Sequence, residues 1–130
     1  MIEGDRPIFL QIAELIENDI VEGHLTADEQ VPSTNEFAAY HRINPATAAK
    51  GINRLVDDGI LYKKRGIGMF VAAGARDTLL ARRKARFVAG YLEPMLTEAQ
   101  KLGISPSEVT AMITRADAEI AGRTGGRAGS

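Results

Sequence analysis

The first part of the chain carries apolar residues at helical spacing, between Pro7 and Gly23. This periodicity predicts an amphipathic helix with one apolar stripe facing a core. The stripe consists of Ile8, Ile12, Leu15, Ile16 and Ile20. The other face is acidic and is expected to face solvent; it carries Glu14, Glu17, Asp19 and Glu22. Gly23 is placed to end the helix.

A short helix is predicted to begin at Ser33. Ser33 and Glu36 fit the capping box S-x-x-E, in which each side chain accepts a hydrogen bond from the main chain of the other residue. The helix is expected to end near His41. Arg42 and Ile43 then form a turn.

A second helix is predicted directly after this turn. Asn44 suits the N-cap, and Pro45 suits the first position because its missing N–H costs nothing there. The helix is expected to reach Asp58, and Gly59 suits the left-handed residue that follows. Its apolar face is formed by Ala48, Ile52, Leu55 and Val56.

A β-hairpin is predicted next, because residues 60–63 and 69–72 are short β-prone runs. Gly66 and Gly68 lie between them, where a hairpin tip needs positive φ. The order helix, turn, helix, hairpin predicts a winged helix-turn-helix, in a fold class that is mainly α with a small β-hairpin. This scaffold places its second helix in the major groove of duplex DNA.

Two more helices are predicted beyond residue 76. The first is expected to run from Asp77 or Thr78 to about Leu102, with an interruption at Pro94, whose ring clashes with the carbonyl four residues earlier. The second starts at the capping box formed by Ser105 and Glu108 and extends to residue 121.

The apolar stripes of these two helices are too wide to bury against each other. We therefore expect a homodimer through residues 78–121. The alternative is that the helices fold back onto the N-terminal domain as additional core. The residues expected in the dimer interface are Leu80, Phe87, Val88, Tyr91, Leu92, Met95, Leu96, Val109, Met112, Ile113 and Ile120.

The predicted organisation is therefore a winged helix-turn-helix over residues 1–75, a two-helix dimerisation or effector region over residues 76–121, and a flexible tail over residues 122–130. The chain has 130 residues, 45% of them hydrophobic, and no cysteine, so no disulfide framework is expected. Its start does not resemble a secretory signal, and no run of 18 apolar residues occurs. We expect a cytoplasmic protein without a membrane partner.

Charge is distributed unevenly along a chain whose net charge is −1. Residues 41–68 contain six basic and two acidic side chains, whereas residues 1–40 contain one basic and nine acidic side chains. A local basic face on a nearly neutral protein suits a DNA-binding protein that relies on specific contacts. Random scatter of surface charge is the other interpretation, and the helix-turn-helix pattern favours the first.

No catalytic or metal site emerges, and no cofactor is expected. His24 and His41 lie in separate segments, without cysteine or an acidic residue at ligand spacing. An enzyme is therefore disfavoured. A winged-helix module that binds an acidic protein partner remains as the alternative to DNA binding.

The residues expected to contact DNA lie at three places. The start of the second helix should meet base edges, the start of the preceding helix should hold a phosphate, and the hairpin tip should follow the backbone or the minor groove. Asn44 has two candidate roles, as a cap or as a base contact, and the cap is favoured. The full set is Ser33, Thr34, Asn35, Asn44, Pro45, Ala46, Thr47, Lys50, Arg54, Lys64, Arg65, Gly66 and Gly68.

Over residues 7–73 the chain resembles bacterial transcription regulators of the GntR family, in particular the small YtrA-like branch. The resemblance rests on the order and spacing of several motifs: Pro7-Ile8-Phe9-x-Gln11-Ile12, Val31-Pro32-Ser33, Ile43-Asn44-Pro45-Ala46-Thr47, Leu55-x-x-x-Gly59-Ile60-Leu61 and Lys64-Arg65-Gly66-x-Gly68-Met69-Phe70-Val71. It implies a repressor of its own operon, often one that encodes an ABC-type transporter, and a short C-terminal region used for dimerisation. It also implies a bacterial protein that lies at the nucleoid when bound to its operator.

Four positions depart from the pattern of that family. Asn35 stands where an arginine that reaches the groove is common, and Asp28 replaces the usual glycine in the link before Val31-Pro32. Ala48 replaces a bulky residue, and Gly51 weakens the interior of its helix by about 1 kcal/mol relative to alanine.

The sequence identifies no effector. A small pocket for an unknown small molecule is conceivable near Arg82, Arg83, Arg86 or Tyr91, where the hinge meets the dimer helices. Solvated or paired surface arginines are the favoured interpretation of that cluster.

Overall fold

The computed structural model describes residues 6–123 of the chain. These residues form two compact units, and the division falls after Arg83. The described part is mainly helical with one antiparallel hairpin, which confirms the predicted fold class. Among these residues, no helix is both long enough and apolar enough to cross a membrane.

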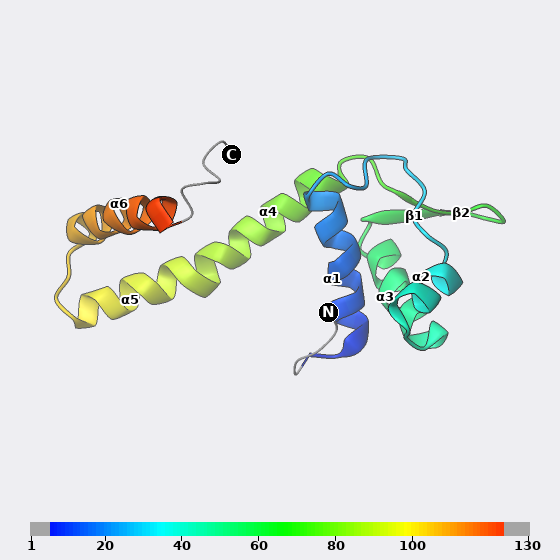
Figure 1. Ribbon diagram of the computed structural model, residues 1–130, viewed down its shortest axis with the longest axis horizontal. Coiled ribbons are helices and arrows are strands. Elements are labelled where there is room, and N and C mark those ends of the chain that lie inside the picture. The colour runs from blue at the N-terminus through cyan, green and yellow to red at the C-terminus, as the bar shows by residue number, and fades with distance from the viewer. Residues whose placement is uncertain (1–5, 124–130) are drawn as a thin grey trace. The chain divides into compact units, whose positions relative to one another are not determined.

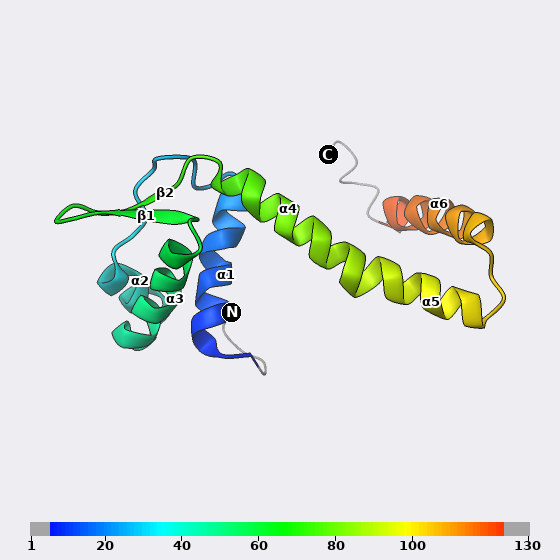
Figure 2. The same cartoon turned by 180° about the vertical axis from the view of Figure 1, so that it is seen from behind.

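Three helices and a hairpin make up most of the N-terminal unit (Figure 1). The helices are α1 (Ile8–Val21), α2 (Thr34–His41) and α3 (Pro45–Asp57). They lie together in the view from either side (Figure 2). Strands β1 (Leu61–Lys64) and β2 (Gly68–Val71) pair with Leu61 opposite Val71, one residue away from the predicted strand ends.

One apolar core holds this unit together. From α1 it takes Ile12, Ile16 and Ile20, all at most 2% exposed, as the helical periodicity predicted. Two expectations for α1 are wrong: Ile8 is 49% exposed, and Glu17 is buried with the core-facing residues rather than facing solvent. The buried apolar residues from the other elements are Val31, Phe37, Ala38, Ala48, Ile52, Leu55, Ile60, Leu61, Val71, Ala75 and Leu79.

The link between α1 and α2, residues 22–33, pairs with the hairpin. The sequence did not indicate this pairing. Gln30 forms an isolated antiparallel bridge with Phe70 of β2. The N–H of Val31 donates to the carbonyl of Met69 at 2.9 Å, and the N–H of Val71 donates to the carbonyl of Glu29 at 2.9 Å. The link therefore lies along β2 as a third extended segment and carries the chain directly into α2.

A long helical stretch leads into the C-terminal unit. It consists of α4 (Ala75–Phe87), a π-helical turn η1 (Val88–Leu92) and α5 (Glu93–Lys101). The prediction that this helix begins at Asp77 or Thr78 is wrong by two or three residues, because Ala75 and Leu79 pack into the N-terminal core. The π turn ends two residues before Pro94, so the predicted interruption takes the form of wider i→i+5 bonding in the turn before a proline that offers no N–H.

The last helix, α6 (Pro106–Arg123), packs alongside α5. Ser105 and Glu108 form the predicted capping box, with Glu108 N–H donating to Ser105 Oγ at 3.1 Å and Ser105 N–H donating to Glu108 Oε1 at 3.0 Å. Gly103 ends α5 with φ +74°, as predicted. The helix continues through Gly122 and Arg123, where a tail was expected; the rest of that tail, residues 124–130, lies outside the described residues.

Candidate nucleic-acid interface

The start of α3 is built by the cap that the sequence predicted. The side-chain Oδ1 of Asn44 accepts hydrogen bonds from Ala46 N–H at 2.7 Å and Thr47 N–H at 3.3 Å. Pro45 occupies the first turn, where its fixed φ favours the helix. Asn44 is exposed, and the cap uses only its carbonyl oxygen, so the two donors of its NH₂ group are not used by the cap.

The exposed end of α3 carries Asn44, Pro45 and Ala46, with Thr47 half-buried beside them. On the opposite face of the helix, Ala48, Ile52 and Leu55 are buried and fix its orientation. The tip is therefore accessible within its unit, as insertion into a major groove requires.

Gly51 lets α3 approach α1 closely. A Cβ atom at this position would lie 2.7 Å from the carbonyl oxygen of Phe9 and 2.9 Å from Cγ2 of Ile12. Such distances are far inside van der Waals contact, so a side chain there would force the two helices apart. The glycine that weakens the helix by propensity is thus required by packing.

Two of the residues on α3 that are predicted to contact DNA make contacts with other side chains of this protein. The Lys50 ammonium lies over the ring of Phe9, 4.2 Å from its centroid, and remains exposed to solvent. Arg54 Nε lies 3.4 Å from Asp58 Oδ2, one turn further along the helix. Lys50 can reach DNA by leaving a cation–π contact worth about 0.5–1 kcal/mol, while Arg54 lies on the last turn, away from the tip.

The start of α2 forms the complete capping box that was predicted. Glu36 N–H donates to Ser33 Oγ at 3.1 Å, and Ser33 N–H donates to Glu36 Oε1 at 2.9 Å. The main-chain N–H of Ser33 is therefore already used by Glu36. An anion at this helix start would instead meet the N–H groups of Thr34 and Asn35.

The hairpin tip presents a cation on a glycine-containing turn. Ile67 N–H donates to the carbonyl of Lys64 at 2.9 Å, and Gly66 between them has φ +75°. Arg65 is exposed at this turn. Lys64 instead lies over the ring of Phe70, 4.6 Å from its centroid, so Arg65 is the cation that projects most directly from the tip.

Gln30 holds the tip in place and was not recognised from the sequence. Its Nε2 donates to the carbonyl of Ile67 at 3.0 Å. Gly68, with φ +147°, leaves room for it, since a Cβ at residue 68 would lie 2.5 Å from Gln30 Nε2. No local signal identifies Gln30, because the contact joins residues 37 positions apart.

The backbone conformation of Asp28 explains why this position, usually glycine in the family, can hold an aspartate. Asp28 adopts φ +66°, a left-handed conformation in which glycine is usual and aspartate is tolerated. Its carboxylate also accepts a hydrogen bond from the Tyr62 hydroxyl at 2.8 Å. That hydrogen bond raises the pKa of Tyr62 above its usual value of 10.0, because deprotonation would break it beside a negative charge.

His24 differs from the sequence expectation, because two acids lie near it in space. Its Nδ1 is 3.4 Å from Asp19 Oδ1 and 3.7 Å from Glu22 Oε1, at the exposed end of α1. The expectation of no acidic residue at ligand spacing from His24 is therefore wrong. His41 lies apart from this group, on α2, where its ring centroid is 4.3 Å from that of Phe37.

Two of the three arginines considered for an effector pocket have partners in the N-terminal unit. Arg83 Nη2 donates to Asn18 Oδ1 at 2.6 Å, and Arg82 Nη2 donates to the carbonyl of Asp58 at 3.4 Å. These bonds favour the interpretation of both as paired surface groups.

Comparison with known proteins agrees with this geometry. Residues 9–71 match the family described as bacterial regulatory proteins, gntR family. The chain is similar to the HTH-type transcriptional repressor YtrA of Bacillus subtilis, with 25% identity over 116 residues that cover 89% of this chain and 88% of YtrA.

Two solved structures extend the likeness. A GntR-family transcriptional regulator from Bacteroides thetaiotaomicron is 32% identical, covers 86% of this chain and 97% of its own, and has a TM-score of 0.74. The DNA-binding domain of AraR, in complex with operator ORX1, is 31% identical over 55% of this chain and 93% of its own, with a TM-score of 0.52. The chain therefore belongs to the GntR family, as a DNA-binding transcriptional regulator of the small YtrA-like type and not an enzyme.

Proposed function

We propose that this regulator is a homodimeric repressor that binds a palindromic operator in the promoter of its own operon. The observation that carries the proposal is the exposed, Asn44-capped start of α3, with its apolar side buried against the rest of the unit. The likeness to the repressor YtrA over nearly the whole chain supports the repressor role. Two-fold symmetry requires the two halves of a dimer's operator to be inverted copies.

Three sets of contacts are proposed within each half-site. Ala46 and Thr47 meet base edges in the major groove, assisted by the NH₂ group of Asn44. The N–H groups at the start of α2 hold a phosphate, and Arg65 at the hairpin tip follows the backbone or enters the minor groove. Lys50 contributes a phosphate or guanine contact.

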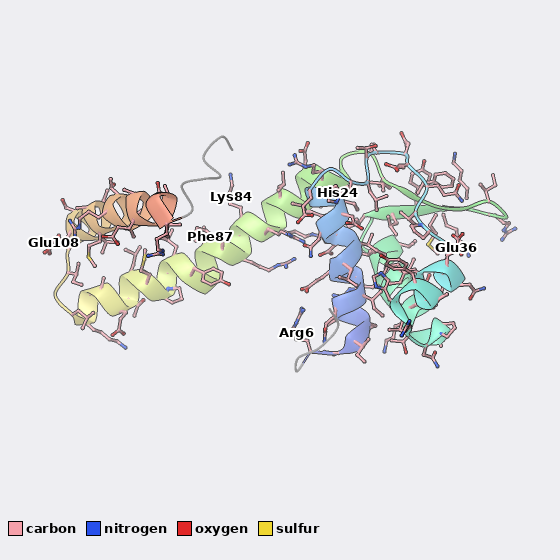
Figure 3. The ribbon with its side chains drawn as sticks, viewed as in Figure 1. Arg6, His24, Glu36, Lys84, Phe87 and Glu108 are labelled. Carbon is pink, nitrogen blue, oxygen red and sulfur yellow. The ribbon has the colours of Figure 1, made fainter. Side chains whose placement is uncertain are left out.

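The proposed dimer interface is the apolar surface of the C-terminal helices. Within the described residues of that unit, only Ala99 and Val109 are buried. Phe87 is 58% exposed and Tyr91 71% exposed, and Phe87 projects outward from the end of α4 (Figure 3). Exposed apolar surface is also contributed by Met95, Leu96, Leu102, Met112, Ile113 and Ile120. So many exposed large apolar side chains on these helices favour a second copy as their cover.

A gel-shift titration with DNA from upstream of its own gene tests the DNA proposal. Arg65→Ala should weaken binding and reduce the slope of log affinity against log salt by about one, because one phosphate contact is lost. Lys101→Ala, at an exposed cation on α5, is the matched control and should leave both quantities unchanged. Unchanged binding by Arg65→Ala would remove the hairpin tip from the interface.

Sedimentation tests the dimer separately. Phe87→Glu places a charge on the apolar surface without touching a buried residue, so it should convert a micromolar dimer to monomer. A wild-type protein that sediments only as monomer at micromolar concentration would contradict the proposed dimer.

The target is proposed to include genes for an ABC-type transporter. Deleting the regulator should raise the transcript of its operon. Unchanged transcript levels would refute autorepression, and an operon without transporter genes would refute the proposed target.

A further inference from the structure

A cavity of about 850 Å³ opens on the N-terminal unit, apart from the predicted DNA contacts. It lies between the end of α1, the link and one face of α2, with Ile16, Leu25, Val31 and Phe37 as its apolar lining. Pockets that take small organic ligands have volumes of about 300–1,000 Å³. This cavity is wide open to solvent, and its volume falls within that range.

Acidic side chains enter this cavity from three different segments. They are Asp19 on α1, Glu29 on the link and Glu36 on α2. Within the described chain, no lysine or arginine is among the lining residues. Asp19 Oδ1 lies 3.4 Å from His24 Nδ1, Glu29 accepts a hydrogen bond from the Thr26 N–H, and Glu36 accepts one from the Ser33 N–H. Their charges are therefore left for a cation to balance.

Three aromatic rings line the cavity beside these acids, all on α2. The ring of His41 lies 4.3 Å from that of Phe37 and 4.9 Å from that of Tyr40, measured between centroids. Phe37 is buried, whereas Tyr40 is 82% exposed. Because the ring of Tyr40 is hardly buried by the fold, it is available to pack against a ligand.

Aromatic faces combined with carboxylates are the chemistry that recognises organic cations, through cation–π attraction and charge pairing in one place. We propose that this cavity is an effector site for a small organic cation with an apolar body, such as a quaternary or aromatic amine. Anionic ligands of the same shape are rejected by the three carboxylates. Glu36, labelled in Figure 3, lies on the α2 side of this site.

The cavity also borders the segment that positions the hairpin tip. Gln30 lines it and donates to the carbonyl of Ile67, while Val31 lines it and donates to the carbonyl of Met69. A ligand that displaces the link therefore acts on the tip and on the start of α2 together. Occupancy is expected to change the affinity for DNA, and this second step rests on the proposed operator binding.

Calorimetric titration of the full chain tests the site, with benzyltrimethylammonium as the probe and phenylacetate as the anion of similar shape. We expect the cation to bind at least ten times more tightly than the anion at low salt. Tyr40→Ala should raise the Kd for the cation about threefold or more, because an exposed cation–π contact is lost. Tyr91→Ala, at an exposed tyrosine of the C-terminal unit, is the matched control and should leave this Kd unchanged.

The second measurement is affinity for upstream DNA at saturating probe, against an equal concentration of sodium phenylacetate to match ionic strength. We expect at least a threefold change in the wild type, and Tyr40→Ala should need about three times more probe to reach the same change. Equal binding of cation and anion, or an unchanged Kd in Tyr40→Ala, would overturn the site. If the affinity for DNA is the same with and without the bound cation, the site is not an effector site. If the protein binds DNA under no condition, the proposed function is refuted instead.

Discussion

Replacing Gly51 by alanine tests the packing of α3 on α1. By helix propensity alone, Gly51→Ala should stabilise the protein by about 1 kcal/mol. The added Cβ would, however, lie 2.7 Å from the Phe9 carbonyl oxygen and 2.9 Å from Ile12 Cγ2. Overpacking of this kind costs about 1–3 kcal/mol, and the upper end applies here because the nearest atom belongs to main chain within α1.

The two terms leave a net loss of about 2 kcal/mol in the free energy of unfolding. For a unit of this size, the loss corresponds to a Tm about 10 °C lower. Urea denaturation followed by circular dichroism measures the free energy, and thermal melting measures the Tm. Because α3 must shift to make room, affinity for upstream DNA should fall as well.

Asn53→Ala is the matched control, since Asn53 is exposed on the same helix. It adds helix propensity without new packing and should raise stability by about 0.5 kcal/mol. If Gly51→Ala were as stable as the wild type or more stable, the close packing of α3 on α1 would not require glycine at this position.

Three further predictions concern the cap, the hairpin and the link. Asn44→Asp should keep the α3 cap and the Tm but greatly weaken DNA binding, because it adds a negative charge at the start of the helix. Asn44→Ala should instead lose about 1 kcal/mol of stability. Equal gel shifts for the wild type and Asn44→Asp would contradict the proposed DNA contact. Gly68→Ala should disrupt the Gln30 contact, lower the Tm and weaken operator affinity in a gel shift. Gly66→Asn should leave the Tm unchanged, because nothing lies within 4 Å of its Cβ and asparagine accepts left-handed φ. A Tm for Gly68→Ala equal to that of Gly66→Asn would contradict the role given to Gln30. The folded-state pKa of Tyr62 lies above its unfolded value, so its bond to Asp28 stabilises the protein below about pH 10 and is lost as pH rises through the folded pKa. Urea melts of wild type and Tyr62→Phe should therefore differ at pH 8 and converge at strongly alkaline pH, and a difference that grows with pH would have the wrong sign.

The sequence predicted those features that depend on a few neighbouring residues. The caps at Ser33, Asn44 and Ser105 form as expected, because each is completed by main-chain groups within three positions. Left-handed Gly59 and Gly103 are confirmed for the same reason, since helix ends need positive φ regardless of the remaining fold.

Features that depend on distant residues were missed. Gln30 and Asp28 owe their roles to segments more than 30 residues away, and no periodicity reports such contacts. Glu17 was assigned to solvent from its charge, but its position on α1 buries it. The assignment of individual residues to DNA contacts and to the dimer interface stays a prediction.

The pairing of the link with β2 has a consequence for the choice of binding site. Main-chain hydrogen bonds join the hairpin to the segment that leads into α2, so they constrain the spacing between the tip and the start of α2 before DNA binds. A DNA-binding unit built in this way presents its hairpin tip and the start of α2 to DNA at a single separation. Stretches of DNA whose groove width does not match that separation must be deformed to bind, and the energy of that deformation depends on base pairs that no side chain touches. Selectivity would then extend beyond the bases that α3 reads.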